Sequence, residues 1–342
     1  MTSRVYLYDA DGRDREIQLD ASTIPALGEH NLVWIDVEHP DADEIARLCA
    51  ALQLTPDCLA LPSAGDEPSL DNYGEHFRFW LEAAPKHGDP REPGTVNATP
   101  RAENGNGAAD PAPGGRIDFL VGLRWLVTIH DAPVACLERF RDQDKAETMI
   151  GLLSPQALAA SLLDWHLGEF FQEVSRIETS IDRLDERVLR EASSSSLLGR
   201  MVAMRRRVSK LRGLLVRQRG VFYGLSRPDF ALVTDAGALP FYQSLAGRFE
   251  RALDEIERAR DLVTGSFELF TSRSSQQTND LVKILTFITA IIGFCAAVAG
   301  LLGMNFELAI FRSGTSGFLA VTGSLVLVAI MSLIYARRRR WI

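Results

Sequence analysis

The sequence predicts an α/β domain, a stalk of long helices and two C-terminal transmembrane helices. Strand-like patterns dominate residues 1–150, apolar residues at helical spacing fill residues 151–280, and two long apolar runs lie within residues 281–342. The 342 residues exceed the usual size of a single core, about 100–200 residues. We therefore expect one soluble part and one membrane part.

The first 52 residues predict a β-hairpin, a further strand and a helix. Two apolar segments, residues 5–8 and 17–19, flank the turn-forming pair Asp11-Gly12, which predicts a β-hairpin. Residues 32–37 form the strongest short strand pattern. A helix capped by Asp41 or Asp43 is expected to run to about Leu52.

Three further strands and one helix complete the expected domain. Residues 77–81, 117–120 and 124–130 have strand patterns, and residues 133–149 predict a helix at the sheet edge. Residues 85–115, between the strands at 77–81 and 117–120, are mostly Gly, Pro, Asn, Ala and Asp. Such a composition predicts a flexible surface loop, because it offers little apolar surface to offset the ordering entropy.

Long helices follow from Pro155 onward. The spacing predicts one helix over residues 157–190, a break at 193–196 and a second helix over 197–225. A third helix begins near Leu239 and continues without a strong breaker to Gly303, a length of roughly 90 Å. It is expected to run as a single stalk into the membrane.

The second long helix is strongly basic, but nucleic acid is not the expected partner. The chain has a formal net charge of −8, and because residues 281–342 carry six Lys and Arg against one Glu, residues 1–280 carry −13. An acidic soluble part disfavours nucleic acid and suits contact with cations. The basic helix is instead expected to pair with acidic residues on its neighbours, for example Glu169, Glu173, Glu178, Asp182, Asp185 and Glu186.

No enzyme constellation is present in the sequence. It contains no nucleophile elbow, no phosphate-binding Gly-x-x-x-x-Gly-Lys loop and no paired metal-binding His, so neither hydrolysis nor ATP use is expected. The isolated His130 and His166 are interpreted as structural. The four Cys form no Cys-x-x-Cys pair and are expected to be reduced.

Two spans end the chain, at about residues 281–303 and 317–336. Between Lys283 and Glu307 there is no charged residue, and this run covers roughly 34 Å as a helix, enough for a hydrocarbon core of about 30 Å. Lys283 and the four Arg after the second span predict cytoplasmic termini by the positive-inside rule. With no apolar signal segment in the first 20 residues, we expect a multi-pass protein of the inner (plasma) membrane.

The first span carries a stripe of small and hydroxyl residues at steps of three and four: Thr286, Thr289, Gly293, Ala296 or Ala297, Gly300 and Gly303. One interpretation is close helix packing, to which small residues are suited. The other is a pore lined by copies of this helix. Both can hold together.

The residues around the first span carry a family resemblance: Asn279, Lys283, Leu285-Thr286, Gly303-Met304-Asn305, Phe306-Glu307 and the basic, Trp-containing C-terminus. Further matches lie in the first domain, at Trp34-Ile35-Asp36, residues 68–73 and residues 126–130. Together they resemble the CorA-type metal-ion transporters, a family that includes ZntB-like zinc transporters. The chain departs from the family at Gly293-Phe294-Cys295-Ala296, where a Pro-Leu-Thr-like segment is common. The missing polar position leaves the identity of the ion open.

The resemblance implies a funnel-shaped homopentamer in the lipid bilayer, with the first span inside and the second outside. Two spans per chain cannot enclose a pathway, so several copies are needed in any case. Gly303, Met304 and Asn305 would then be the selectivity motif. Pore-lining candidates are Asn279, Val282, Leu285, Thr286, Thr289 and Gly293, and Glu268 is a candidate for regulatory metal sensing.

Divalent cations are expected as transported or regulatory ions, with no other cofactor. Mg²⁺ is favoured, with Co²⁺ and Ni²⁺ beside it, because the expected pathway offers oxygen ligands from Asn, Thr and the backbone. The alternative is Zn²⁺ transport, with or without coupling to protons. A different class, a membrane-anchored sensor or scaffold without transport, also fits two spans and long helices.

Overall fold

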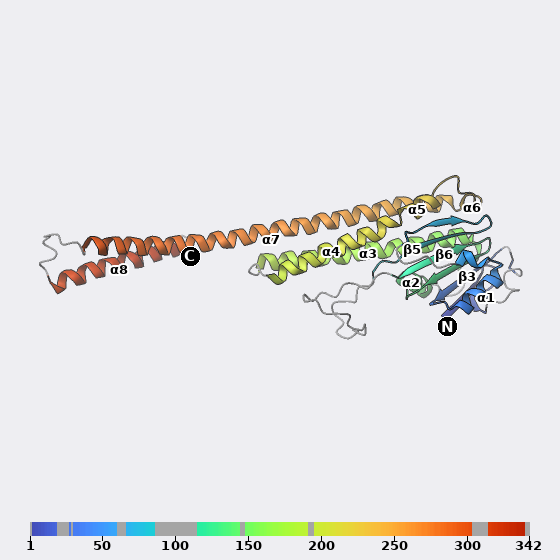
Figure 1. Ribbon diagram of the computed structural model, residues 1–342, viewed down its shortest axis with the longest axis horizontal. Coiled ribbons are helices and arrows are strands. Elements are labelled where there is room, and N and C mark those ends of the chain that lie inside the picture. Colours follow the sequence, from blue (N-terminus) through green and yellow to red (C-terminus); the bar gives the residue numbers. More distant parts are fainter. Residues whose placement is uncertain are drawn as a thin grey trace. The chain divides into compact units, whose positions relative to one another are not determined.

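The computed structural model describes residues 2–18, 27–28, 30–59, 66–85, 115–143, 148–190, 195–302 and 314–338. The chain divides into two compact units (Figure 1). The first unit comprises Met1–Leu184 and Leu198–Gly265, and the second comprises Asp185–Leu197 and Ser266–Ile342. The predicted loop at 85–115 lies outside the described residues, apart from Pro85 and Gly115.

The first unit contains a seven-stranded sheet in the order β2-β1-β3-β7-β6-β5-β4. Its strands are β1 (Thr2–Asp9), β2 (Arg15–Ile17), β3 (Asn31–Glu38), β4 (Leu70–Asn72), β5 (Phe77–Glu82), β6 (Arg116–Val121) and β7 (Trp125–His130). The predicted hairpin is confirmed, because Val5 pairs with Ile17 in antiparallel register. β3 and β7 pair in parallel, and the other described strand pairs are antiparallel.

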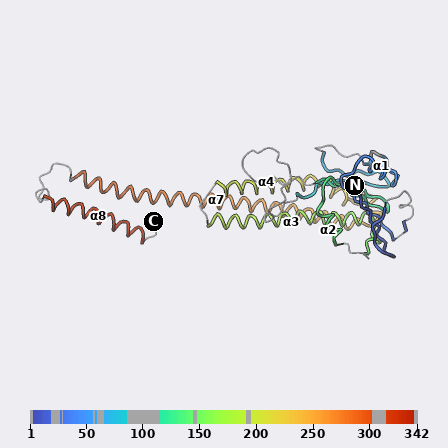
Figure 2. The backbone as a smooth tube through the Cα atoms, turned by 90° about the horizontal axis from the view of Figure 1, so that it is seen from below, coloured from blue at the N-terminus to red at the C-terminus, as the bar shows by residue number. Residues whose placement is uncertain are grey.

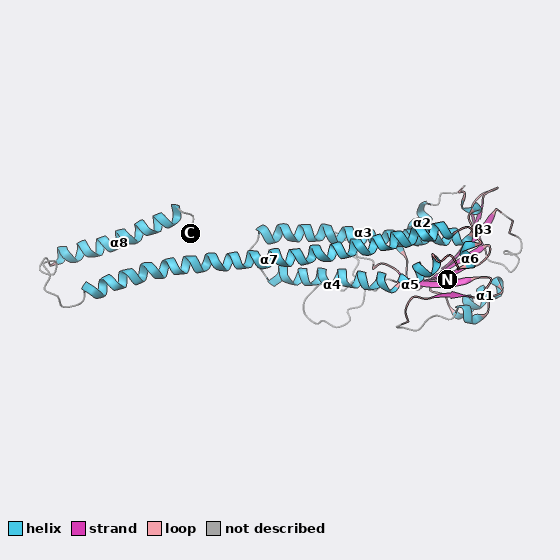
Figure 3. Cartoon of the chain, turned by 90° about the horizontal axis from the view of Figure 1, so that it is seen from above, coloured by secondary structure: helices cyan, strands magenta, loops and turns pink. Residues whose placement is uncertain are grey.

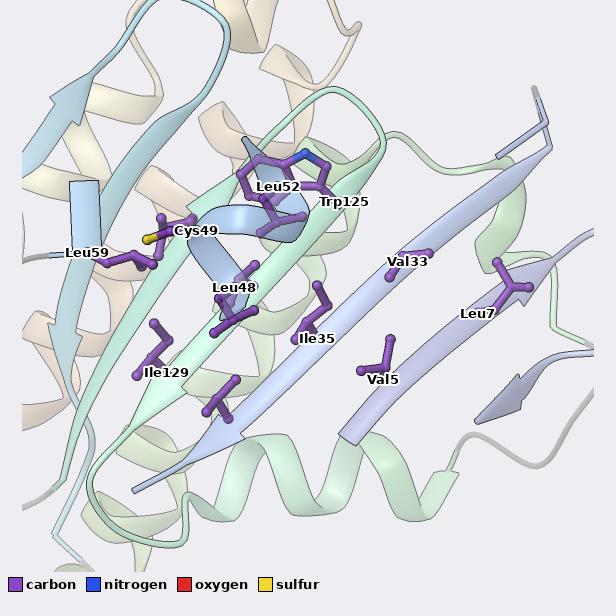
Figure 4. Close-up of a cluster of buried hydrophobic side chains, with 13 residues drawn as sticks. Val5, Leu7, Val33, Ile35, Leu48, Cys49, Leu52, Leu59, Trp125 and Ile129 are labelled. Carbon is purple, nitrogen blue, oxygen red and sulfur yellow. The ribbon is translucent and has the colours of Figure 1, made fainter. Parts of the chain in front are cut away.

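One face of the sheet is covered by α1 (Ala42–Leu52) and the short helix η1 (Pro56–Leu59). Figure 4 shows Leu48, Cys49 and Leu52 of α1 over the sheet, beside β3, which carries Val33 and Ile35. Asp41 caps α1, since its side chain accepts a hydrogen bond from the backbone N of Glu44 at 2.7 Å. The predicted choice between Asp41 and Asp43 is thereby resolved.

The helix predicted over residues 133–149 is shorter in the structure. α2 covers Ala135–Gln143, and residues 144–147 are not described. From Thr148 the chain is held against the β1–β2 turn, because Asp14 Oδ2 accepts hydrogen bonds from both the N and the Oγ1 of Thr148. Gly151 in η2 (Ile150–Leu152) then passes so close to β1 that a Cβ there would lie 2.6 Å from the N of Ala10. These tertiary contacts prevent the helix from extending over the predicted range.

A helical bundle completes the first unit. It is built by α3 (Pro155–Arg190), α4 (Ser195–Arg217), α5 (Arg219–Leu225), α6 (Ala231–Thr234) and the start of α7 (Leu239–Leu302). The predicted helix over 197–225 is interrupted at Gln218, whose side-chain amide donates to the carbonyls of Glu82 and Leu214 and accepts from His166 Nε2 at 2.8 Å. Gln218 therefore joins β5, α3 and α4 at the point where α4 ends.

The ion pairs of α4 correct the predicted set of partners. Arg207 pairs with Glu173 of α3, as expected. The partners of Arg212, Arg217 and Arg219 lie elsewhere, at Glu257, Glu82 and Glu250. β5 and α7 therefore supply the partners of Arg212 and Arg217 at the end of α4 and of Arg219 at the start of α5.

The second unit contains the rest of α7 and α8 (Thr315–Arg338). α7 is a single helix of 64 residues, so the predicted continuous helix from residue 241 is confirmed. Both helices are long and apolar enough to cross a membrane, as the sequence predicted.

On the second face of the sheet, a buried charged cluster joins β3, β7 and α2. Asp36 Oδ2 accepts from Arg141 Nη1 at 2.7 Å, while Oδ1 accepts from Thr128 Oγ1 at 2.6 Å and faces His130 Nε2 at 3.2 Å. His130 Nδ1 faces the carbonyl of Ala132 at 2.8 Å. Both ring nitrogens thus meet oxygens that only accept hydrogen bonds, which favours the doubly protonated imidazolium. The structural interpretation of His130 is consistent with these contacts.

The cluster predicts that the stability of the first unit falls at alkaline pH. Burial opposes the charge on His130, but the hydrogen bond and negative charge of Asp36 outweigh it and raise the pKa of His130, with Glu38 contributing further. Since a raised pKa contributes stability below the ordinary value of about 6.5 and loses it as pH rises through the folded-state value, unfolding should become easier above neutral pH. Thermal unfolding of the full chain in detergent at several pH values measures this effect.

The control is a second histidine with the opposite shift. His130→Gln should remove this part of the pH dependence and lower stability by about 1–3 kcal/mol, the cost of a lost charged hydrogen bond. His76→Gln should leave the loss of stability at alkaline pH in place, because burial lowers the pKa of His76. An unchanged pH profile in His130→Gln would contradict the assignment.

Candidate functional site

The predicted pore-lining residues lie on one exposed side of α7. Asn279, Thr286, Thr289 and Gly293 are exposed in the chain, and so is Val282, at 53% of its maximal area. Steps of three and four residues place these five residues on one face of a helix. Leu285, also exposed, lies about 100° from Thr286 and therefore at the edge of this face. We call the five residues the α7 stripe.

The opposite side of α7 is partly covered and has its own regular spacing: Ile284, Phe287, Ile291, Cys295 and Val298. Partly or fully buried positions on α8 also follow one face: Gly317, Val321, Leu325, Ala329, Ser332 and Ala336. In Figure 3, α8 runs back along the end of α7. The matching spacing indicates that these two faces turn toward each other. Figure 2 shows α8 returning beside α7 and diverging from it toward the end of α8. The α7 stripe points away from the partly covered side of α7.

The glycines on the exposed side of α7 are not explained by packing within the chain. A Cβ built on Gly293 or on Gly300 would meet no atom within 4 Å. Glycine in a helix interior costs about 1 kcal/mol relative to alanine, so the residue usually has a packing or functional reason. Among the described residues, that reason is not contact with α8.

The hydroxyl groups of this helix are oriented toward their own backbone. Thr289 Oγ1 donates to the carbonyl of Leu285 at 2.8 Å, and Thr278 Oγ1 donates to Ser274 O at 3.0 Å. A hydroxyl that has used its proton in this way keeps its lone pairs for other partners. It can therefore accept hydrogen bonds from water around a cation.

The remaining candidates are placed less completely. Gly303, Met304 and Asn305 lie outside the described residues. Glu268 is exposed on α7, and within the described ranges it forms no ion pair. Those ranges also hold no group of three or more His, Cys, Asp or Glu side chains that could bind a metal. The members of the α7 stripe with side-chain oxygens, Asn279, Thr286 and Thr289, are neutral.

Sequence reasoning did not predict which side of the first span the second span would cover. The sequence does contain a second regular face, because Ile284, Phe287 and Ile291 follow the same helical spacing as the stripe, half a turn away. This second face could be interpreted only once the partly buried face of α8 was known. The ion pair between Lys283 Nζ and Asp280 Oδ1, at 2.9 Å beside Asn279, was also not anticipated.

These features define a membrane protein with a soluble α/β unit, a long helix that continues into a span, and one exposed small-residue face on that span. The profile of the CorA-like Mg²⁺ transporter protein family matches residues 29–338. The chain belongs to this family, whose members are membrane transporters of metal ions and not enzymes.

Individual relatives agree with this assignment. The chain is 27% identical to the cobalt/magnesium transport protein CorA of Thermotoga maritima over 54% of its own length, which spans about half (52%) of that protein. It is 19% identical to the corresponding protein of Methanocaldococcus jannaschii, over 97% of both chains. The complete structure of the CorA magnesium transporter from M. jannaschii matches 100% of this chain and 99% of that one, with a TM-score of 0.73 and 16% identity. The ZntB cytoplasmic domain of Vibrio parahaemolyticus matches 81% of this chain and all of the domain, with a TM-score of 0.55 and 14% identity.

Proposed function

We propose that several copies of this chain form a transmembrane pathway for divalent metal cations, with Mg²⁺ as the main substrate and Co²⁺ and Ni²⁺ beside it. The observation that carries the proposal is the α7 stripe, which is polar or small and lies opposite the contact with α8. A face of this kind is suited to a hydrated ion, whereas the large apolar side chains elsewhere on both spans suit lipid.

A pathway requires more than one copy, because two spans cannot surround it. Cyclic symmetry closes a ring of identical contacts, and family membership supports a homopentamer in which α7 lies inside and α8 outside. The observed packing is compatible with this order, since α8 leaves the α7 stripe uncovered. Both termini would be cytoplasmic and the protein would lie in the inner (plasma) membrane.

The chemistry of the pathway favours an ion that keeps its water. Asn305 would form an outer ring whose amide oxygens accept hydrogen bonds from the hydration shell, with Gly303 and Met304 shaping the turn. Thr286 and Thr289 add hydroxyl oxygens further along. At the cytoplasmic end, Asn279 would form a polar ring, followed by Val282 and Leu285 as an apolar constriction. Mg²⁺ dehydrates reluctantly, so neutral oxygen groups that act through water suit it.

Zn²⁺ transport is the second candidate. Among the described residues of the two spans, Cys295 is the single Cys or His, the side chains that Zn²⁺ prefers. It lies on the partly buried side of α7 and not on the stripe. A Zn²⁺ pathway would therefore also have to carry the hydrated ion. The likeness to a ZntB cytoplasmic domain concerns the fold alone.

The deciding experiment measures uptake into proteoliposomes that contain ion-selective dyes. Mg²⁺ influx is expected, with smaller Co²⁺ and Ni²⁺ influx and no dependence on a pH gradient. Asn305→Ala should reduce this flux at least tenfold while leaving the assembly intact, whereas Ser324→Ala on α8 serves as the control and should leave it unchanged. Zn²⁺ flux that rises with an inward proton gradient, without Mg²⁺ flux, would favour the second candidate. A sensor or scaffold would show no flux of any ion.

Cysteine labelling tests which side of α7 meets water. In a Cys295→Ala background, Val282→Cys and Thr289→Cys should react with a charged thiol reagent at least ten times faster than Phe287→Cys and Ile291→Cys, because charged reagents do not enter lipid or packed helices. Mass spectrometry of the reconstituted protein measures the rates. Equal rates on both sides would refute the assignment of the stripe.

Glu268 is proposed to take part in sensing cytosolic divalent ions, since it is an exposed carboxylate on α7 without an ion-pair partner in the described chain. Glu268→Ala should then raise several-fold the internal Mg²⁺ concentration needed to inhibit uptake. Asp142→Ala, at an exposed carboxylate on α2, is the matched control. An inhibition curve identical to wild type would remove this role from Glu268.

A further inference from the structure

Opposite charges on α3 and α4 have no ion-pair partner among the residues that the structure describes. Glu178 is half-buried and Asp182 is exposed on α3, one turn apart on the same face, while Arg205 is exposed on α4. In the part of the chain that the structure describes, no ion pair involves any of these three. Like charges at this spacing repel each other by a few tenths of a kcal/mol, so the pair on α3 is mildly unfavourable in an isolated chain.

The packing of α3 on α4 explains why these charges cannot meet within one chain. Arg207 and Glu173 form the ion pair that faces the contact between the two helices. Glu178 is five residues from Glu173 and Arg205 is two residues from Arg207, which turns each side chain by about 140–160° away from that contact. The two charged faces therefore form separate flanks of the bundle.

The α4 flank also carries apolar surface. Leu198, Val202 and Arg205 follow each other at steps of four and three residues on one face of the helix. Leu198 is 41% exposed and Val202 is 37% exposed. The acidic α3 flank consists of Glu178 and Asp182. The α4 flank thus combines positive charge with uncovered apolar side chains, and the α3 flank contributes negative charge.

The two flanks lie at the same height along the bundle. α3 and α4 run in opposite directions, and the pair between Glu173 and Arg207 sets their register. Five residues toward the C-terminus from Glu173 on α3 lies Glu178, and five residues toward the N-terminus from Arg207 on α4 lies Val202. Because the helices are antiparallel, these two positions are level along the bundle. Arg205 is three residues from Val202, about 4.5 Å along the axis, within reach of a carboxylate at the level of Glu178.

We propose that the α4 flank of one copy contacts the α3 flank of the next copy around the ring. A ring of identical contacts repeats one pairing of flanks at every interface. Because the two flanks are level along the bundle, they can meet where neighbouring bundles run side by side. Arg205 then meets Glu178 and Asp182 of the next copy, and the exposed Leu and Val side chains are covered. The contact is heterologous, since each copy uses a different flank toward each neighbour. It rests on the proposed assembly into a ring.

Charge reversal tests this contact in the full chain in detergent. Arg205→Glu and Glu178→Arg should each raise the concentration at which half of the chains are assembled by about tenfold, because like charges then face each other at every interface. The two changes combined should restore assembly to within about twofold of wild type. Arg183→Glu, at an exposed arginine on another face of α3, is the matched control and should have no effect.

Disulfide trapping gives an independent readout in membranes. In the Cys295→Ala background, Glu178→Cys with Val202→Cys should yield a ladder of linked chains under mild oxidation, while either change alone should not. The pair Arg183→Cys with Val202→Cys is the control without a ladder. If the wild type assembles and transports but the single charge reversals have no effect, or the combined reversal does not restore assembly, the proposed contact is wrong. The proposed transport pathway is then unaffected. A wild type that neither assembles nor transports would instead refute the proposed function.

Discussion

The spans of this protein are organised by a one-sided contact between α7 and α8. In hydrocarbon the backbone must satisfy its own hydrogen bonds, which both spans achieve as helices, and association then depends on close packing because lipid is as apolar as the side chains. α7 and α8 use one face each for this contact. The α7 stripe on the other side holds Asn279, Thr286, Thr289 and Gly293 beside Val282, and its small and polar residues allow close approach of another helix or of water. Larger apolar side chains such as Ile288 and Ile292 lie exposed outside the stripe.

The first unit follows a different rule, in which buried charge is paired. Asp118 is buried against Arg78 at 2.6 Å, Glu173 against Arg207, and Asp36 against Arg141 and His130. An unpaired charge in these positions would carry a large desolvation cost, so each pair specifies which elements must lie together more than it adds net stability. The pairs join strand to strand, helix to helix and helix to sheet. The charges left over lie at the surface of the bundle, where a second copy can reach them.

The α4 helix shows how the same residue type can have two roles. Its arginines were expected to pair with acidic residues of neighbouring helices, such as those of α3, and Arg207 does so. Arg212 pairs with α7 and Arg217 with β5, and Arg219 at the start of α5 pairs with α7. The difference arises from helical phase, because a shift of two residues moves a side chain to nearly the opposite side. Charge counts along a sequence contain no information about this phase relative to neighbours.

The sequence alone predicted most of the strands and helices, the two spans, the continuous helix α7 and the family, because these depend on periodicity, uninterrupted apolar length and local motifs. It also identified the stripe of small residues on the first span. The tertiary structure decided where α2 stops, since the contact of Thr148 with Asp14 is distant in sequence, and where α4 breaks, since Gln218 binds β5 and α3. It decided above all which side of α7 is free, because α8 could have covered either face and only the packed helices show which one it took.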